Sequence, residues 1–90
     1  MGVKVNVNPI LHYFAEGQNV VEVNGSTIGE CLKELVAKVP GLKKSLFDEE
    51  GVLHDYLEIY INRERVHPDD YGRPVRDGDE LYVMPIIDGG

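Results

Sequence analysis

The sequence of 90 residues has a single cysteine and no apolar run near the roughly 18 residues that a membrane span needs. One cysteine cannot form an internal disulfide, and no Cys-x-x-Cys or His-x-x-x-His pair offers a metal site. The N-terminus also lacks a charged stretch followed by an apolar one, as a secretion signal would have. These absences predict a cytoplasmic protein that binds neither a metal nor a membrane.

Basic residues are scarce as well, with 9 Lys and Arg against 16 Asp and Glu and a net charge of −7. Nucleic-acid binding rests on Lys and Arg clusters that contact phosphates, so the composition argues against it. Residues 1–47 hold five Lys and four Glu, a balance of +1, whereas residues 48–90 hold four Arg and twelve acids, a balance of −8. This acidic half either solvates the chain or steers a basic partner towards it.

Apolar and polar residues alternate in four segments, a pattern typical of strands with one buried face. The segments are residues 3–7, 19–23, 56–61 and 80–84. Between the third and fourth, prolines and glycines break residues 63–78 too often for a long element. The sequence therefore predicts four strands.

A helix is expected between the second and third of these strands. Thr27 and Glu30 fit a capping box at its start, and Pro40-Gly41 ends it. Its apolar residues recur every three or four positions, which directs one stripe towards a core; they are Ile28, Cys31, Leu32, Leu35, Val36 and Val39. Residues 42–47 continue as a short second helical turn.

The order strand, strand, helix, strand, strand indicates an α+β fold, a mixed sheet with one main helix packed across one face. The opposite face then meets solvent or a partner. By alternation it carries Tyr56 and Tyr60 of the third strand and Tyr82 and Met84 of the fourth. Aromatic residues and Met are enriched in protein interfaces, although single apolar residues are also common on surfaces. We favour a partner-docking face.

The chain closes with Pro85, Ile86, Ile87, Asp88, Gly89 and Gly90. Extended, these six residues reach roughly 20 Å. Two glycines have no Cβ, so they can thread a narrow channel in a partner's active site. An α-carboxylate has a pKa of about 3.5, so it is an ionised nucleophile at neutral pH. The C-terminus is therefore a candidate reactive group.

The sequence offers no catalytic group of its own to activate that carboxylate. His12, His54 and His67 are scattered, and Cys31 lies on the apolar stripe of the helix, where a buried and inert thiol is expected. A glycine-rich phosphate loop is absent. We therefore expect no intrinsic catalytic residue, and a partner enzyme as the catalyst.

These features resemble the ubiquitin-like β-grasp sulfur carriers, which include the molybdopterin synthase small subunit, the thiamine sulfur carrier and the carrier of a cysteine-synthesis route. The most specific match is Val75-Arg76-Asp77-Gly78-Asp79-Glu80-Leu81-Tyr82-Val83-Met84-Pro85 leading to Gly89-Gly90. Weaker matches are Thr27-Ile28, Pro40-Gly41-Leu42 and Ile59-Tyr60-Ile61-Asn62.

The resemblance implies a β-grasp domain over residues 1–84 and a flexible C-terminal diglycine tail over residues 85–90. It also implies that an ATP-dependent activating enzyme adenylates Gly90 and that sulfur then replaces AMP. The resulting thiocarboxylate would donate sulfur to an accepting synthase in molybdopterin-type cofactor or cysteine biosynthesis. The chain itself would bind no cofactor, because the partner uses the ATP.

Two other functions remain open at this point. A ubiquitin-like modifier joined through Gly90 to target lysines would share the same chemistry up to the adenylate. A β-grasp interaction module would make no use of the diglycine.

Overall fold

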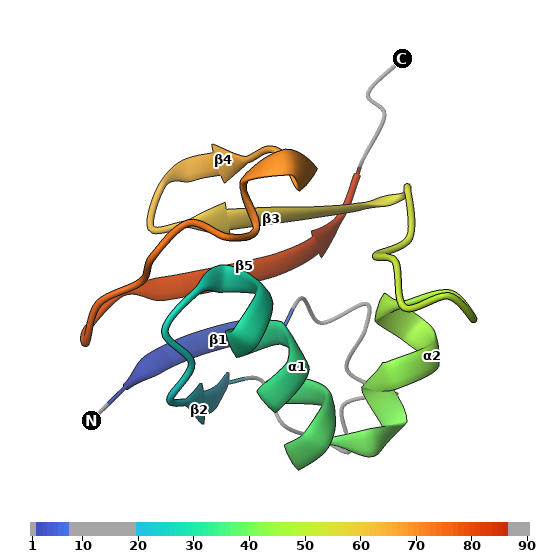
Figure 1. The fold of residues 1–90 in the computed structure, drawn as a ribbon, viewed down its shortest axis with the longest axis horizontal. Coiled ribbons are helices and arrows are strands. Elements are labelled where there is room, and N and C mark those ends of the chain that lie inside the picture. Colours follow the sequence, from blue (N-terminus) through green and yellow to red (C-terminus); the bar gives the residue numbers. More distant parts are fainter. Residues whose placement is uncertain (1, 8–19, 87–90) are drawn as a thin grey trace.

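In the part of the chain that the structure describes, five strands form one mixed sheet in the order β2-β1-β5-β3-β4 (Figure 1). The computed structural model describes residues 2–7 and 20–86. The strands are β1 (Val3–Val7), β2 (Val20–Val23), β3 (Leu57–Ile61), β4 (Glu64–Val66) and β5 (Glu80–Pro85). β1 and β5 are parallel, and the other neighbouring pairs are antiparallel. The expected mixed sheet is confirmed, and β5 lies at its centre.

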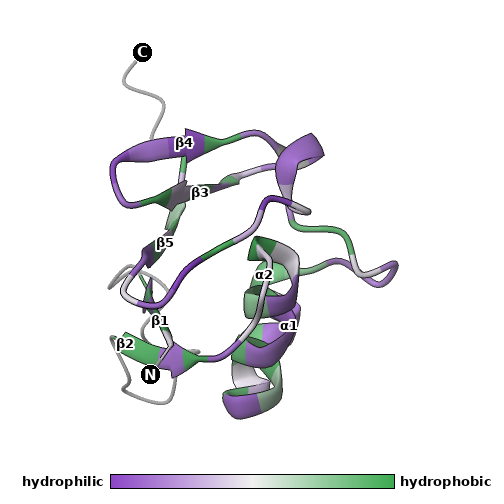
Figure 2. Ribbon diagram, turned by 60° about the vertical axis from the view of Figure 1, so that its left-hand side comes forward, coloured by the Kyte–Doolittle hydropathy of each residue, from purple (hydrophilic) through white to green (hydrophobic). Residues whose placement is uncertain are grey.

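The helices lie on one face of this sheet (Figure 2). They are α1 (Ile28–Lys38), the 3-10 turn η2 (Pro40–Leu42) and α2 (Lys43–Leu46). A further 3-10 turn, η3 (Pro68–Asp70), follows β4. The expected layout of one main helix across one face is therefore confirmed, with η2 and α2 as its short continuation. No helix in the two described ranges is long and apolar enough to cross a membrane.

The start of α1 is held by the capping residues and by a distant segment of chain. The Thr27 hydroxyl accepts from the Glu30 N–H at 3.2 Å. The Glu30 carboxylate accepts from the Ser26 N–H at 2.9 Å, one residue before the expected position. The N–H groups of the first two helical residues, Ile28 and Gly29, donate to the carbonyls of Arg73 and Tyr71 at 3.1 and 2.8 Å. The first turn of α1 is thus tied to the segment that precedes β5.

The core lies between the helices and the sheet, and it contains only apolar side chains among the described residues. It is built from every second residue of the strands and from the apolar stripe of α1. Its fully buried larger members are Ile28, Leu32, Leu35, Leu42, Leu46, Ile59, Leu81, Val3, Val5, Val23, Val39 and Val83. The expected stripe is confirmed, although Val36 is only partly buried.

The strand β4 is a fifth strand that the sequence pattern did not predict. It pairs antiparallel with β3 through Ile61 opposite Glu64 and Ile59 opposite Val66. The connection is a tight turn at Asn62 and Arg63, in which Asn62 has a φ of 56°. Asparagine tolerates this left-handed conformation better than most residues do. The sheet therefore extends one strand beyond β3.

Candidate functional site

The face of the sheet away from the helices brings together three of the four residues expected to form a docking face. Tyr60 of β3 lies directly opposite Tyr82 of β5, and Met84 lies opposite Glu58. Side chains directly opposite each other on antiparallel strands are in contact range. All three are partly exposed. We call Tyr60, Tyr82 and Met84 the open-face cluster.

Polar side chains of β3, β4 and β5 border the open-face cluster. The Tyr82 hydroxyl donates to the Glu80 carboxylate at 2.8 Å, and this hydrogen bond raises the pKa of Tyr82 above its ordinary value because it favours the neutral phenol. On β4, Arg65 stands opposite Tyr60 and pairs with Glu58 through an Nε–Oε1 distance of 3.1 Å. An apolar centre with a polar rim is typical of a protein interface.

Tyr56, the fourth expected docking residue, lies just before β3 and is not part of the open-face cluster. Its ring stacks on His54, with centroids 4.9 Å apart and planes 12° apart. It is 54% exposed. Alternation assigned Tyr56 to the strand, but β3 begins at Leu57, and a turn closed by the Leu57 N–H on the His54 carbonyl precedes it.

The strand β5 ends at Pro85, one residue beyond the end that alternation predicts. Pro85 pairs with Leu57, and the Ile86 N–H donates to the Tyr56 carbonyl at 2.7 Å. Both residues are therefore held against β3, at the far end of the central strand (Figure 1). The other predicted terminal residues, Ile87, Asp88, Gly89 and Gly90, lie outside the described residues.

The described histidines and the cysteine occupy separate places. His54 Nε2 lies 2.9 Å from the Lys44 carbonyl, and His67 is exposed after β4. His12 lies outside the described residues. Burial raises the pKa of the Cys31 thiol, with a smaller contribution from the Glu34 and Glu30 carboxylates, so the thiol stays protonated. Within residues 2–7 and 20–86, no three His, Cys, Asp or Glu residues come close enough to hold a metal.

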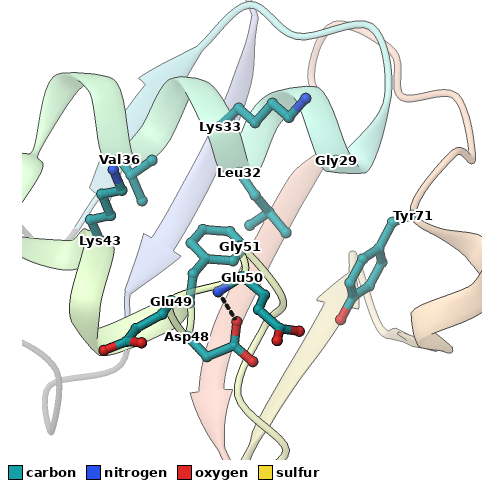
Figure 3. Close-up of a pocket in the computed structure, with 11 residues that line it drawn as sticks. Gly29, Leu32, Lys33, Val36, Lys43, Asp48, Glu49, Glu50, Gly51 and Tyr71 are labelled. Atoms are coloured by element: carbon teal, nitrogen blue, oxygen red, sulfur yellow. Dashed lines mark hydrogen bonds between the residues drawn. The ribbon is translucent and has the colours of Figure 1, made fainter.

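A hollow of about 460 Å³ beside α1 was not expected from the sequence (Figure 3). Leu32 and Val36 of α1 line it together with Tyr71, and an acidic loop over residues 48–51 forms its opposite wall. Burial raises the pKa of Tyr71, so its phenol is neutral. Leu32 and Val36 belong to the predicted apolar stripe of the helix, but no pattern in the sequence places them beside Tyr71 and residues 48–51.

The comparisons with known proteins agree with this geometry. A family model described as the ThiS family matches residues 5–90. Small archaeal modifier protein 1 of Haloferax volcanii is 34% identical over 71 residues, 78% of this chain and 78% of that protein.

Two solved structures show the same fold over nearly the whole chain. A chain in the BexX/CysO complex of Amycolatopsis orientalis has a TM-score of 0.83 at 32% identity, covering 99% of this chain and 100% of that one. CysO of Mycobacterium tuberculosis has a TM-score of 0.82 at 30% identity, covering 96% and 100%. The β-grasp fold is thereby confirmed. The chain belongs to the ThiS family, as a small ubiquitin-like carrier or modifier protein and not a catalytic enzyme.

Proposed function

We propose that this protein carries sulfur as a thiocarboxylate on Gly90. In the first step an oxygen of the Gly90 carboxylate attacks the α-phosphorus of ATP in a partner enzyme, and pyrophosphate leaves. A donor sulfur at the oxidation level of hydrosulfide then attacks the acyl carbon, and AMP leaves with the carboxylate oxygen. A synthase of molybdopterin-type cofactor or cysteine biosynthesis accepts the sulfur.

The observation that carries this proposal is the position of β5. It is the central strand, paired with β1 on one side and with β3 on the other, and its pairing runs to Pro85 and Ile86. The four residues that follow reach about 14 Å when extended. The family match also runs to residue 90. A rigid domain followed by four terminal residues can deliver the C-terminal carboxylate into the active site of another protein.

A thiocarboxylate fits what this chain can provide. A docked carrier presents the sulfur at high effective concentration and releases no free sulfide. The buried, protonated Cys31 is a poor alternative, because nucleophilic sulfur chemistry needs an exposed thiolate. The proposal therefore assigns the sulfur to the C-terminal carboxylate.

Intact-mass measurement tests the proposed function. After incubation with an adenylating enzyme of this family, ATP and a sulfide donor, the protein is expected to gain the mass difference of one sulfur replacing one oxygen. Cys31→Ala should gain the same mass, because its thiol is not the carrier. An unchanged mass beside an active partner, or a gain that requires Cys31, would contradict the proposal.

We further propose that the open-face cluster docks partner proteins. The Amycolatopsis orientalis relative was solved in complex with BexX, so partner binding occurs in this family. Tyr60→Ala and Tyr82→Ala are each expected to weaken binding of the activating enzyme by about tenfold, as central aromatic contacts do. Isothermal titration calorimetry measures the change in Kd.

Tyr82→Phe provides the matched control for docking. It removes only the hydroxyl that binds Glu80 and keeps the ring, so its Kd should stay near that of the wild type. Met84→Ala tests the third member of the cluster. If Tyr60→Ala, Tyr82→Ala and Met84→Ala all bind normally, the open-face cluster is not the docking face.

A second candidate function is protein modification through Gly90. It is favoured by the similarity to small archaeal modifier proteins 1 and 3 of Haloferax volcanii, at 34% and 35% identity. The last basic residue is Arg76, so trypsin would leave residues 77–90 on a modified lysine. Mass spectrometry of a cell digest would identify that branch, and its absence from a culture that expresses the protein would argue against modification.

A further inference from the structure

Three exposed apolar side chains gather at the place where the described chain ends. Val52, Tyr56 and Ile86 are 55%, 54% and 42% exposed, and Val20, at 48%, is the other large apolar side chain exposed to this degree among the described residues. Val52 and Ile86 line one groove of about 430 Å³, and Tyr56 stacks on His54, which also lines it. Such clustering of exposed apolar surface marks an interaction site.

The groove opens on the helix-bearing face of the sheet, towards which Leu57 and Val66 point, whereas the open-face cluster lies on the other face. Arg65 of the edge strand β4 borders both. The floor of the groove includes Leu57 of β3 and Val66 of β4, both buried in the core, with Phe47 and Tyr71 at its walls. We call this the C-terminal groove. It is large enough for one or two apolar side chains, within the range of typical binding pockets.

Hydrogen bonds hold the loop that displays Val52. The Asp48 N–H donates to the Val52 carbonyl at 2.8 Å, and the Asp48 carboxylate accepts from the N–H groups of Glu50 and Val52 at 2.8 and 3.0 Å (Figure 3 shows the bond to Glu50). Gly51 closes the turn with a φ of 82°, which favours glycine. Val52 is thus exposed on an ordered loop, and a partner meets a preorganised surface at low entropic cost.

The other two side chains are also fixed. The His54 N–H donates to the Leu46 carbonyl at 2.9 Å, which positions the ring on which Tyr56 stacks. The Ile86 N–H donates to the Tyr56 carbonyl at 2.7 Å. The groove and the start of the terminal residues are therefore one connected structure.

The charges around the C-terminal groove favour a basic partner. Arg65 lines the groove but is neutralised by Glu58 at 3.1 Å. Asp55 is exposed on the groove wall. The neighbouring hollow, which shares Phe47 and Tyr71, is lined by three acids over residues 48–50 against the two lysines Lys33 and Lys43, so the charge around the groove is negative on balance. An apolar side chain flanked by Lys or Arg would complement this surface.

We propose that the C-terminal groove receives an apolar side chain, flanked by basic residues, of the enzyme that adenylates Gly90. This inference rests on the proposed function. Four residues separate Ile86 from Gly90, a reach of about 14 Å, so an enzyme that encloses Gly90 has its surface beside Ile86. Such an enzyme contacts both faces of the sheet, the open-face cluster on one face and the C-terminal groove on the other.

Two valines with similar exposure give a matched experiment. Val52→Asp places a charge at the groove, and Val20→Asp places the same charge on β2, the far edge strand. Steady-state kinetics of thiocarboxylate formation are measured with the adenylating enzyme that modifies the wild-type chain. Val52→Asp is expected to raise the KM for the carrier by about tenfold with kcat unchanged, whereas Val20→Asp keeps the wild-type KM.

The outcomes separate this inference from the proposed function. A wild-type KM for Val52→Asp, or an equal rise for both variants, overturns the groove assignment while thiocarboxylate formation stands. Loss of a self-associated form with unchanged KM, seen by light scattering, also overturns it, in favour of a second copy as the occupant. If the wild-type chain is not modified at all, the proposed function fails and the inference with it. Should Val52→Asp not fold by circular dichroism, Val52→Ser replaces it under the same criteria.

Discussion

Deleting Gly90 is expected to abolish thiocarboxylate formation completely and to leave the unfolding temperature unchanged. The variant would end at Gly89, so its carboxylate falls one residue, about 3.5 Å, short of the position that the activating enzyme requires. The fold should not respond, because the described core lies between Val3 and Val83 and the last described hydrogen bond of the sheet is at Ile86. Intact-mass measurement and thermal unfolding give the two readouts.

Two glycine variants sharpen this prediction. Gly90→Ala keeps the chain length but adds a methyl group beside the reacting carbonyl, and it should slow the reaction if the partner's channel admits only glycine. Gly72→Ala serves as the control, because a Cβ at that position meets no atom within 4 Å. A chain that lacks Gly90 and still gains sulfur, or one that unfolds at a lower temperature, would contradict the expected result.

Leu35→Ala should show the opposite pattern, a large loss of stability with an unaltered C-terminus. Leu35 is fully buried on α1, within the core shared with the sheet. Removing a buried leucine side chain leaves a cavity and costs about 2–5 kcal/mol. This is a large share of the roughly 5–15 kcal/mol that stabilises a domain. Urea denaturation measures the free energy of unfolding.

The control for Leu35→Ala lies on the same helix. Lys33 is exposed on α1, so Lys33→Ala should change the free energy of unfolding by no more than about 0.5 kcal/mol. A loss below about 1 kcal/mol for Leu35→Ala would mean that the helix closes the cavity by moving, and that the core tolerates less exact packing than its burial indicates.

Much of the fold could be predicted because the burial pattern is regular. β1 and β3 alternate strictly, with Val3, Val5 and Val7 buried in the one, and α1 buries its stripe every three or four residues. These elements each span enough residues to display their period. The three residues of β4 do not: only Val66 is buried, and the pattern is too short to be distinguished from a loop.

The end of β5 could not be predicted from local chemistry. Alternation predicts a strand that ends at residue 84, and proline usually ends or edges a strand because it has no N–H to donate. In the structure, alternate N–H groups of β5 point towards β3, among them that of Ile86. Pro85 thus faces away from β3, so its missing N–H costs no hydrogen bond between β5 and β3. The division into a domain over residues 1–84 and a flexible tail over residues 85–90 stays a prediction.

One part of the candidate site could be predicted from the sequence and the other could not. The open-face cluster follows from alternation, because Tyr60, Tyr82 and Met84 all lie within strands. The C-terminal groove depends on an irregular loop and on which strands become neighbours, and β3 and β5 are far apart in sequence. The position of Val52 beside Ile86 is therefore a property of the tertiary structure.

The central position of β5 has a mechanical consequence. A partner that draws the terminal residues into its own site pulls along β5, and the load is shared by the hydrogen bonds to β1 and β3 on its two sides. These bonds lie across the direction of the pull, so they resist together in shear and are not opened one after another, as those of an edge strand can be. Central strands also open only with global unfolding. The domain can thus be held under tension through β5 while the surfaces on both faces of the sheet keep their shape.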